Sequence, residues 1–319
     1  MRRPFIGLSL ILAAAGAALW AQRETVIRVD VRLVRVLATV KNAAGDLVGS
    51  LAKEDFQILD SGVPQQIALF ERHTEQPLSV ALLVDTSGST AKELKSEIDS
   101  VSRFLNALFG SGNPDDAVAL YSFNYQVTQH NNFTKNHRSL ERSMRTFKAE
   151  AGTALYDAIF LAAEGLEGRE GRRVMIVVTD GGDTISNRNF HQALEAAQMA
   201  DAVIYPVLIM PVTNPAGRNI GGENALTNLA RSTGGKVSTA TLGPPLDAAF
   251  SEIIRELRTQ YLLGYYPKDV PPSSNRFHKI EVRVSRPDLR VSARNGYYGD
   301  AEGGPEPAGS RVAAPPRER

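Results

Sequence analysis

Apolar and polar residues alternate with two different periods along the chain, and the change of period predicts its architecture. Continuous apolar runs, typical of central parallel strands covered on both faces, lie at 80–84, 117–123, 173–180 and 202–210. Apolar residues recur at helical spacing between and after these runs, at 91–109, 136–148, 154–167, 189–200 and 245–258. Strands that alternate with helices predict an α/β fold over 76–260, with a doubly wound, mostly parallel, Rossmann-like sheet.

The segments on either side of this region have β character. Residues 25–40 alternate apolar and charged side chains, the pattern of a half-exposed strand, and two short apolar runs flank Ser61 and Gly62 as in a hairpin. We therefore predict an N-terminal β unit at 23–75 and antiparallel β strands at 261–299. We expect these two segments to pack together, because neither can bury an apolar face alone.

The N-terminus has the layout of a secretory signal peptide. Arg2 and Arg3 precede an apolar stretch from Phe5 to Trp20, and small residues lead to a predicted cleavage site near Ala21. An uncleaved membrane anchor is the alternative, although the stretch is shorter than the roughly 20 apolar residues of a spanning helix. Residues 1–21 thus predict an exported protein, periplasmic, surface-bound or secreted, with no membrane span in the mature chain.

Composition narrows the classes of partner. The 319 residues hold 36 Lys and Arg against 35 Asp and Glu, and no basic block interleaves with aromatic residues, so we expect no nucleic-acid partner. The chain has no cysteine, so disulfides contribute nothing to its fold. The Pro-, Gly- and charge-rich residues 300–319 predict a disordered tail.

Oxygen-bearing side chains follow the predicted strands. Asp85 ends the apolar run 80–84, Ser87 and Ser89 come next, Thr153 lies in the stretch "GTALYDA", and Asp180 ends the run at 173–180. In an open parallel sheet, ligands bind beyond the carboxyl ends of the strands. Hydroxyl and carboxylate oxygens without imidazole or thiolate suit Mg²⁺, with Ca²⁺ or Mn²⁺ as competitors. Helix capping and turn formation are the alternative for Asp-x-Ser-x-Ser alone.

These motifs resemble the metal-ion-dependent adhesion site (MIDAS) of von Willebrand factor A (vWA) domains, including the integrin inserted domains. The resemblance implies that Ser87 and Ser89 bind the metal directly, Thr153 directly or through water, and Asp85 and Asp180 mainly through water. The flanking stretches "DFQILDSGVPQQIALFE", "YLLGYYP" and "RVSARNGYY" resemble an exported family of acidobacteria that is described as vWA-related.

The sequence predicts less specific roles for the other polar residues. Asp183 is interpreted either as a solvated loop acid or as an outer group of the metal site, and Asp157 as a structural hydrogen-bonding residue. The five histidines show no metal-ligand spacing and are expected at the surface or at sheet edges. The polar stretch 212–226 is expected to be a loop, functional or merely connecting.

The sequence therefore predicts an exported, non-catalytic module that binds a protein partner through a divalent cation. The partner is expected to present an Asp or Glu carboxylate to the metal. In the alternative, a structural or envelope-assembly protein, the cation only stabilises the fold. A hydrolase is disfavoured because no Gly-x-Ser-x-Gly motif and no nucleophile–base pair is visible in the sequence.

Overall fold

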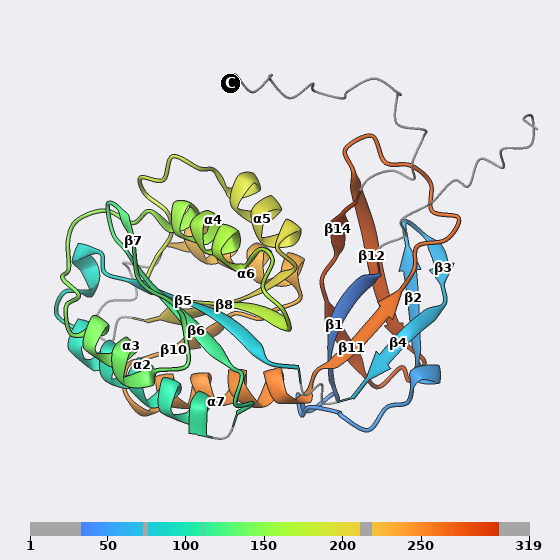
Figure 1. Ribbon diagram of the computed structural model, residues 1–319, viewed down its shortest axis with the longest axis horizontal. Coiled ribbons are helices and arrows are strands. Elements are labelled where there is room, and N and C mark those ends of the chain that lie inside the picture. The colour runs from blue at the N-terminus through green and yellow to red at the C-terminus, as the bar shows by residue number, and fades with distance from the viewer. Residues whose placement is uncertain (1–32, 73–75, 111, 211–218, 300–319) are drawn as a thin grey trace, which may run out of the picture. The chain divides into compact units, whose positions relative to one another are not determined.

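The computed structural model describes residues 33–72, 76–110, 112–210 and 219–299. Within these ranges the chain forms a six-stranded sheet flanked by helices and two four-stranded sheets (Figure 1). The predicted signal peptide at 1–21 and the predicted tail at 300–319 lie outside the described residues. Among the described helices, none combines the length and the apolarity that crossing a membrane requires.

The six-stranded sheet confirms the predicted α/β fold. Its strand order is β10-β9-β8-β5-β6-β7, and all neighbouring strands are parallel except β6 and β7. The strands are β5 (Leu78–Asp85), β6 (Ala117–Phe123), β7 (Val127–Thr134), β8 (Arg172–Thr179), β9 (Ala202–Ile209) and β10 (Ser238–Ala240). The helices are α2 (Leu94–Gly110), α3 (His137–Met144), α4 (Leu155–Leu166), α5 (Phe190–Met199), α6 (Ile220–Thr233) and α7 (Pro244–Thr259).

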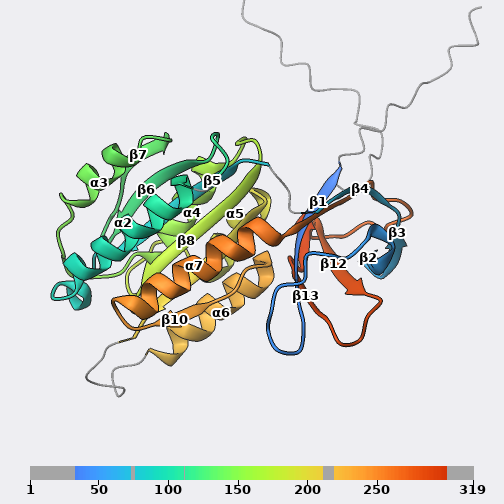
Figure 2. The same cartoon turned by 90° about the horizontal axis from the view of Figure 1, so that it is seen from below.

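Continuous apolar strands form here because helices cover both faces of this sheet (Figure 2). In β5, Leu82 belongs to the apolar cluster that includes side chains of α2 and α7. Its neighbour Leu83 belongs to the opposite cluster, which includes side chains of α4, α5 and α6. Since successive strand residues point to opposite faces, every position of β5 is buried.

Helix α6 corrects the expectation of a loop over 212–226. Residues 211–218 lie outside the described part, but α6 begins at Ile220, and its preceding residue Asn219 accepts a 2.9 Å hydrogen bond from the Gly222 amide. The Gly221–Gly222 pair suggested a loop; Gly222 instead permits close packing, because a Cβ there would lie 2.5 Å from the Cα of Gly182. The antiparallel edge strand β7 was also missed, since its polar side chains show no apolar alternation.

The two smaller sheets join the segments before and after the α/β region. One has the order β13-β1-β11-β4 and the other β14-β12-β2-β3, so each sheet combines strands from both segments. Both contribute side chains to one buried cluster that includes Val36, Ile58, Tyr261 and Ile280. The strands are β1 (Val34–Lys41), β2 (Phe56–Asp60), β3 (Val63–Gln65), β4 (Ile67–Glu71), β11 (Tyr261–Tyr265), β12 (Phe277–Val284), β13 (Arg290–Ala293) and β14 (Gly296–Tyr298).

The hairpin predicted at Ser61 and Gly62 joins β2 to β3. Both turn residues have positive φ, 49° at Ser61 and 86° at Gly62, as a two-residue type I′ turn requires. The expectation for the histidines is wrong for His278, which is buried in β12 and stacks on Tyr297. Its ring lies beside Asp60, with 3.7 Å between Nδ1 and a carboxylate oxygen.

Candidate metal centre

Asp85 is the last residue of β5 and is fully buried. One carboxylate oxygen accepts a 2.8 Å hydrogen bond from the Ser87 amide, and the other accepts a 2.6 Å hydrogen bond from the Thr179 hydroxyl. Thr179 ends β8, the neighbouring parallel strand. The carboxylate is therefore held from its own loop and from the adjacent strand.

Ser87 and Ser89 lie in the loop that leaves β5, where a short 3₁₀ turn spans Gly88–Thr90. The Thr90 hydroxyl donates a 2.9 Å hydrogen bond to the Ser87 carbonyl and holds this turn. The hydroxyl oxygens of Ser87 and Ser89 are 3.0 Å apart. Two neighbouring ligands of an octahedral Mg²⁺ ion lie about 2.9 Å apart, because each metal–oxygen distance is about 2.0–2.1 Å. The serine pair thus fits such an ion as well as it fits a mutual hydrogen bond.

Thr153 lies on a loop that the backbone anchors beside the serines. The Glu150 amide donates a 3.0 Å hydrogen bond to the Thr86 carbonyl, next to Ser87 in the chain. On the other side, the Thr153 amide donates a 2.9 Å hydrogen bond to the Thr184 hydroxyl. The Thr153 side chain itself forms no hydrogen bond with another described residue, and the residue is 8% exposed. Its hydroxyl is available to an external group.

Asp180 directly follows β8, one residue after the Thr179 that contacts Asp85. The residue is half-buried, and its carboxylate forms no hydrogen bond or ion pair with another described residue. Asp85 thus contacts Ser87, and Ser87 contacts Ser89, while Asp180 follows the neighbouring strand β8. The structure gives no contact between Thr153 and the other four predicted residues.

The electrostatics of this sheet edge favour a cation. Burial raises the pKa of Asp85 to about 6, against the lowering effect of the Thr179 and Ser87 hydrogen bonds, and the charge of Asp180 adds to the rise. Glu97 of α2 is also buried, and neither carboxylate oxygen has a hydrogen-bond partner among the described residues. Its pKa is raised well above the usual range by burial first and then by the charges of Asp85 and Asp180. A cation at this edge would favour the ionised forms of both carboxyls and lower their pKa values.

The chemistry of the donor set fits a hard divalent ion. No group of three or more His, Cys, Asp or Glu side chains suited to a metal occurs in the described ranges, so such a site must use hydroxyls. Ser87, Ser89 and Thr153 would hold the ion, with Asp85 and Asp180 supplying negative charge around it. When bound, the ion would present an electrophilic centre to an acidic group.

Two nearby acids have structural partners. Asp157 accepts hydrogen bonds from the backbone amides of Asn187 and Arg188 at 3.0 and 2.8 Å, which confirms it as a structural hydrogen-bonding residue. Asp183 accepts a 3.2 Å hydrogen bond from the Tyr156 amide in the first turn of α4, and another from the Ser186 hydroxyl. Asp183 therefore anchors its loop to α4.

Sequence reasoning missed Thr179, Thr184 and Glu97. The position of Thr179 immediately before Asp180, at the end of an apolar run, was the available signal for a hydroxyl at this edge. The contact of Thr184 with Thr153 spans 31 positions and left no local signal. Glu97 lies on the buried face of an amphipathic helix, where an acid interrupts the apolar spacing.

The expectation that no nucleophile–base pair exists needs correction. The Ser122 hydroxyl and His130 Nε2 are 2.8 Å apart across β6 and β7. No described carboxylate pairs with His130, its ring packs against Phe147, and burial lowers the pKa of His130. The pair therefore lacks the acidic group that orients histidine in a Ser-His-Asp triad.

The six-stranded sheet thus carries an aspartate and two serine hydroxyls at the carboxyl end of β5. Residues 80–182 match the family model described as von Willebrand factor type A domain. This segment of the chain is therefore a vWA domain, as its motifs predicted. The narrower resemblance to exported acidobacterial proteins stays a prediction. No curated protein sequence matches the chain significantly.

Several solved structures are similar to part of this chain. The vWF domain of the type V pili tip protein Mfa5 from Porphyromonas gingivalis is 16% identical, with a TM-score of 0.45, over 56% of this chain and 94% of that one. BatB from Bacteroides thetaiotaomicron is 21% identical, with a TM-score of 0.43, over 56% and 97%. The pilus adhesin SpaC from Lactobacillus rhamnosus GG is 10% identical, with a TM-score of 0.48, over 76% and 47%. These likenesses concern chain arrangement and transfer no activity.

Proposed function

We propose that this protein is an exported, non-catalytic module that binds a protein partner through a divalent cation. Ser87, Ser89 and Thr153 would hold the cation, with Mg²⁺ as the first candidate and Ca²⁺ or Mn²⁺ as competitors. Asp85 and Asp180 would act mainly through water. An Asp or Glu carboxylate of the partner would complete the coordination.

The arrangement of Asp85, Ser87 and Ser89 carries this proposal. The aspartate is buried and fixed by two hydrogen bonds, and the serine hydroxyls next to it have the spacing of neighbouring metal ligands. Hydroxyl ligands carry no charge. This site, with two carboxylates, would therefore neutralise a divalent ion less than a site in which three or four carboxylates bind the ion directly. The ion would keep affinity for one more anionic ligand, which is the property that carboxylate recognition needs.

Three further parts of the proposal have separate support. Export is supported by the basic start at Arg2 and Arg3 and the apolar stretch that follows it. A non-catalytic role is supported by the lack of a described carboxylate beside the Ser122–His130 pair. Protein binding agrees with the vWA assignment of residues 80–182, since domains of this type commonly bind protein partners.

A structural cation is the second candidate, and the electrostatics favour it. Asp85 and Glu97 are buried, and both have pKa values raised by burial and by other acids. A divalent ion at this edge would stabilise the fold by offsetting that charge, whether or not a partner binds.

Calorimetric titration with Mg²⁺ tests the metal site. We expect saturable binding to the wild type and strongly weakened binding to Ser89→Ala. Ser96→Ala is the matched control, because Ser96 is an exposed serine of α2 and should leave binding unchanged. Equal binding by Ser89→Ala and the wild type would remove the proposed ligand set.

Partner capture then separates the two candidates. Immobilised wild-type protein is exposed to the producing cell's envelope proteins in Mg²⁺ or in chelator, with Ser89→Ala and Ser96→Ala in parallel. Capture that requires both Mg²⁺ and Ser89, and that is lost when a partner Asp or Glu is replaced by its amide, supports the binding module. Mg²⁺ binding that raises the melting temperature without metal-dependent capture supports the structural cation.

A further inference from the structure

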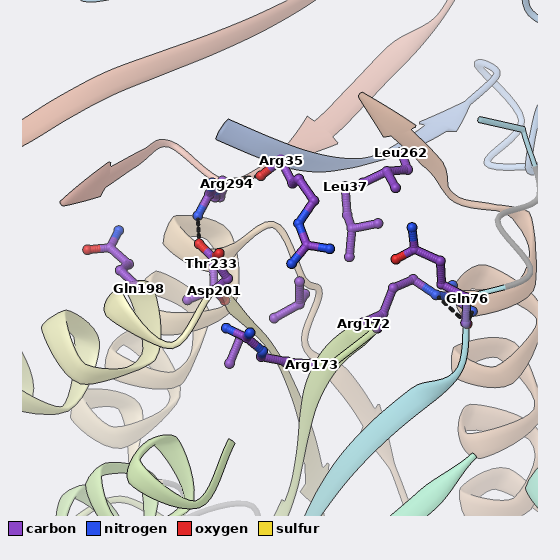
Figure 3. A pocket seen from close by; sticks show the side chains of 13 residues that line it. Arg35, Leu37, Gln76, Arg172, Arg173, Gln198, Asp201, Thr233, Leu262 and Arg294 are labelled. Atoms are coloured by element: carbon purple, nitrogen blue, oxygen red, sulfur yellow. Dashed lines mark hydrogen bonds and ion pairs between the residues drawn. The ribbon is translucent and has the colours of Figure 1, made fainter. Parts of the chain in front are cut away.

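A small pocket lies at the amino ends of β8 and β9 (Figure 3). Asp85 lies at the opposite, carboxyl edge of the same sheet. Its walls also include residues of β1 and β11, and Arg294, which follows β13. The pocket offers about 40 Å³ to the centres of water-sized molecules. This is room for a few waters or one small polyatomic ion.

The charge of the pocket wall is strongly positive. Four arginines line it, Arg35, Arg172, Arg173 and Arg294, and Asp201 is the one carboxylate among the described lining residues. Asp201 pairs with Arg294. The wall therefore carries three more guanidinium groups than carboxylates.

Neutral acceptors hold two of these arginines in place. Arg172 is 2% exposed and donates to the backbone carbonyls of Gln76 and Leu257. Arg173 donates to the carbonyls of Arg169 and Ala200 at 2.7 and 2.9 Å. Carbonyl partners fix the side chains without neutralising them, and the charges of Asp116 and Asp201 offset only part of the effect of burial on Arg172 and Arg173 respectively.

Burial and neighbouring arginines both disfavour the charged forms of Arg172 and Arg173. The pKa of Arg172 is lowered to about 10, by burial first and then by the charge of Arg258, while Asp116 acts in the opposite direction. Burial also lowers the pKa of Arg173; the charge of Asp201 opposes this decrease, and the charge of Arg35 adds to it.

Two donors at this pocket have no acceptor in the described part of the chain. The side chain of Arg294 is 10% exposed, and its buried Nε has no hydrogen-bond partner. The guanidinium of Arg35 forms no hydrogen bond or ion pair with a described residue. Figure 3 shows the Arg35 side chain extending from β1 into the pocket, between Arg294 and Arg172. Because an unpaired buried N–H is costly, an acceptor is expected beside the Nε of Arg294, and the half-buried Arg35 offers further donors next to it.

We propose that this pocket binds a small oxyanion of the phosphate class, with Arg35, Arg173 and Arg294 as its main donors. Guanidinium groups suit this ligand because their N–H groups match the oxygens of phosphate in pairs. Because hydrogen bonds already hold Arg172 and Arg173 in place, these side chains lose little conformational freedom when the anion binds. The small volume favours a free ion over a nucleotide.

This anion site is independent of the proposed metal site. Arg172 and Arg173 begin β8, and Asp180 follows its last residue, so the two sites lie roughly 23 Å apart along a strand that rises about 3.3 Å per residue. Failure of one site therefore leaves the other untouched.

Calorimetric titration of the full chain with inorganic phosphate tests the proposal. The buffer contains a chelator, so that phosphate cannot bind through a metal, and sodium chloride keeps the ionic strength constant. We expect one saturable site in the wild type. Arg35→Gln should weaken phosphate binding roughly ten- to hundredfold, because a charge-assisted hydrogen bond is lost.

Three further variants make the result interpretable. Arg173→Gln should also weaken binding and serves as a second probe if Arg35→Gln changes the circular dichroism spectrum. Arg290→Gln, an exposed arginine of β13 outside the pocket, and Ser89→Ala should both bind like the wild type. Absence of phosphate binding by the wild type, wild-type affinity in both pocket variants, or loss of binding in Ser89→Ala would each overturn the proposal.

Discussion

The hydroxyl of Thr179 donates a 2.6 Å hydrogen bond to Asp85 across the β5–β8 pair. Both residues are fully buried and lie at the carboxyl ends of their strands. This contact fixes one oxygen of Asp85, and the Ser87 amide fixes the other. The orientation of the candidate metal centre thus depends on a neighbouring strand as well as on its own loop.

Replacing Thr179 with valine should weaken metal binding without changing the ligands. Valine keeps the shape of the threonine side chain but has no hydroxyl donor. Asp85 therefore loses the hydrogen bond from Thr179, which lowers the pKa of Asp85 in the wild type. We expect Mg²⁺ affinity at pH 7 to fall roughly 10- to 100-fold, the usual effect of losing a group that orients a metal ligand. Titration calorimetry measures it. Thr239→Val, at an exposed position of β10, is the control, and equal losses in both variants would refute the orienting role.

Glu97 should make the metal-free protein less stable as the pH rises. The folded state raises the pKa of Glu97 above its unfolded value, so its contribution to stability is complete below about pH 4.5 and is lost at higher pH. The free energy of unfolding should fall by up to about 1.4 kcal/mol per pH unit until the folded pKa is reached. Glu97→Gln should remove this slope.

Urea unfolding in chelator between pH 6.5 and 8 measures the Glu97 effect. Asp85, with a pKa of about 6, adds a slope of the same sign mainly below this window. Glu195→Gln replaces an exposed acid of α5 and should keep the wild-type slope. Parallel stability curves for Glu97→Gln and the wild type would show that Glu97 does not titrate as described.

Gly152 should be required for the loop that carries Thr153. Its φ is 87°, a conformation that other residues adopt at a cost, and a Cβ there would lie 2.7 Å from the Ile185 side chain. Gly152→Ala should destabilise the fold by about 1–2 kcal/mol and weaken Mg²⁺ binding. Chemical denaturation and calorimetry measure the two effects. Gly110→Ala, at the end of α2 with open space around it, should do neither, and an unchanged Gly152→Ala would contradict the placement of this loop.

Lys41 should couple the strand β1 to helix α7. Its Nζ lies 2.7 Å from a carboxylate oxygen of Glu256, whose side chain is 4% exposed and also accepts a 3.1 Å hydrogen bond from Tyr205. Lys41→Met leaves that carboxylate without its cation, so we expect a loss of about 3 kcal/mol in unfolding free energy. Lys236→Met breaks an exposed pair with Glu252 and should cost less than about 1 kcal/mol. Equal losses would show that the Lys41 pair is no more than a surface contact.

The sheet domain was predictable because its signals are local. Runs such as 173–180 and helical spacing such as 245–258 depend only on neighbouring residues, and they correspond to β8 and α7. Helix α6 was not predicted because the Gly221–Gly222 pair is typical of a loop. A glycine is needed at position 222 because it packs against Gly182, which lies 40 positions away in the sequence.

The candidate site was predictable only in part, for the same reason. Asp85, Ser87 and Ser89 form a spaced motif within one loop, whereas the contact of Thr179 with Asp85 joins residues 94 positions apart. The arginine pocket had no sequence signal at all. Its arginines come from β1, from the start of β8 and from the position after β13; β1 and β13 pair in one sheet, and β8 belongs to another.

The central claim is that hydroxyls at the carboxyl edge of the sheet hold a divalent cation. Anomalous diffraction from crystals of the protein grown with Mn²⁺ tests it most directly, because the anomalous signal distinguishes the ion from water. We predict a single strong peak bonded to the hydroxyl oxygens of Ser87 and Ser89, beside Thr153, that is absent from crystals of Ser89→Ala. A peak that contacts none of these hydroxyls, or no peak at this edge with saturating Mn²⁺, would contradict the account.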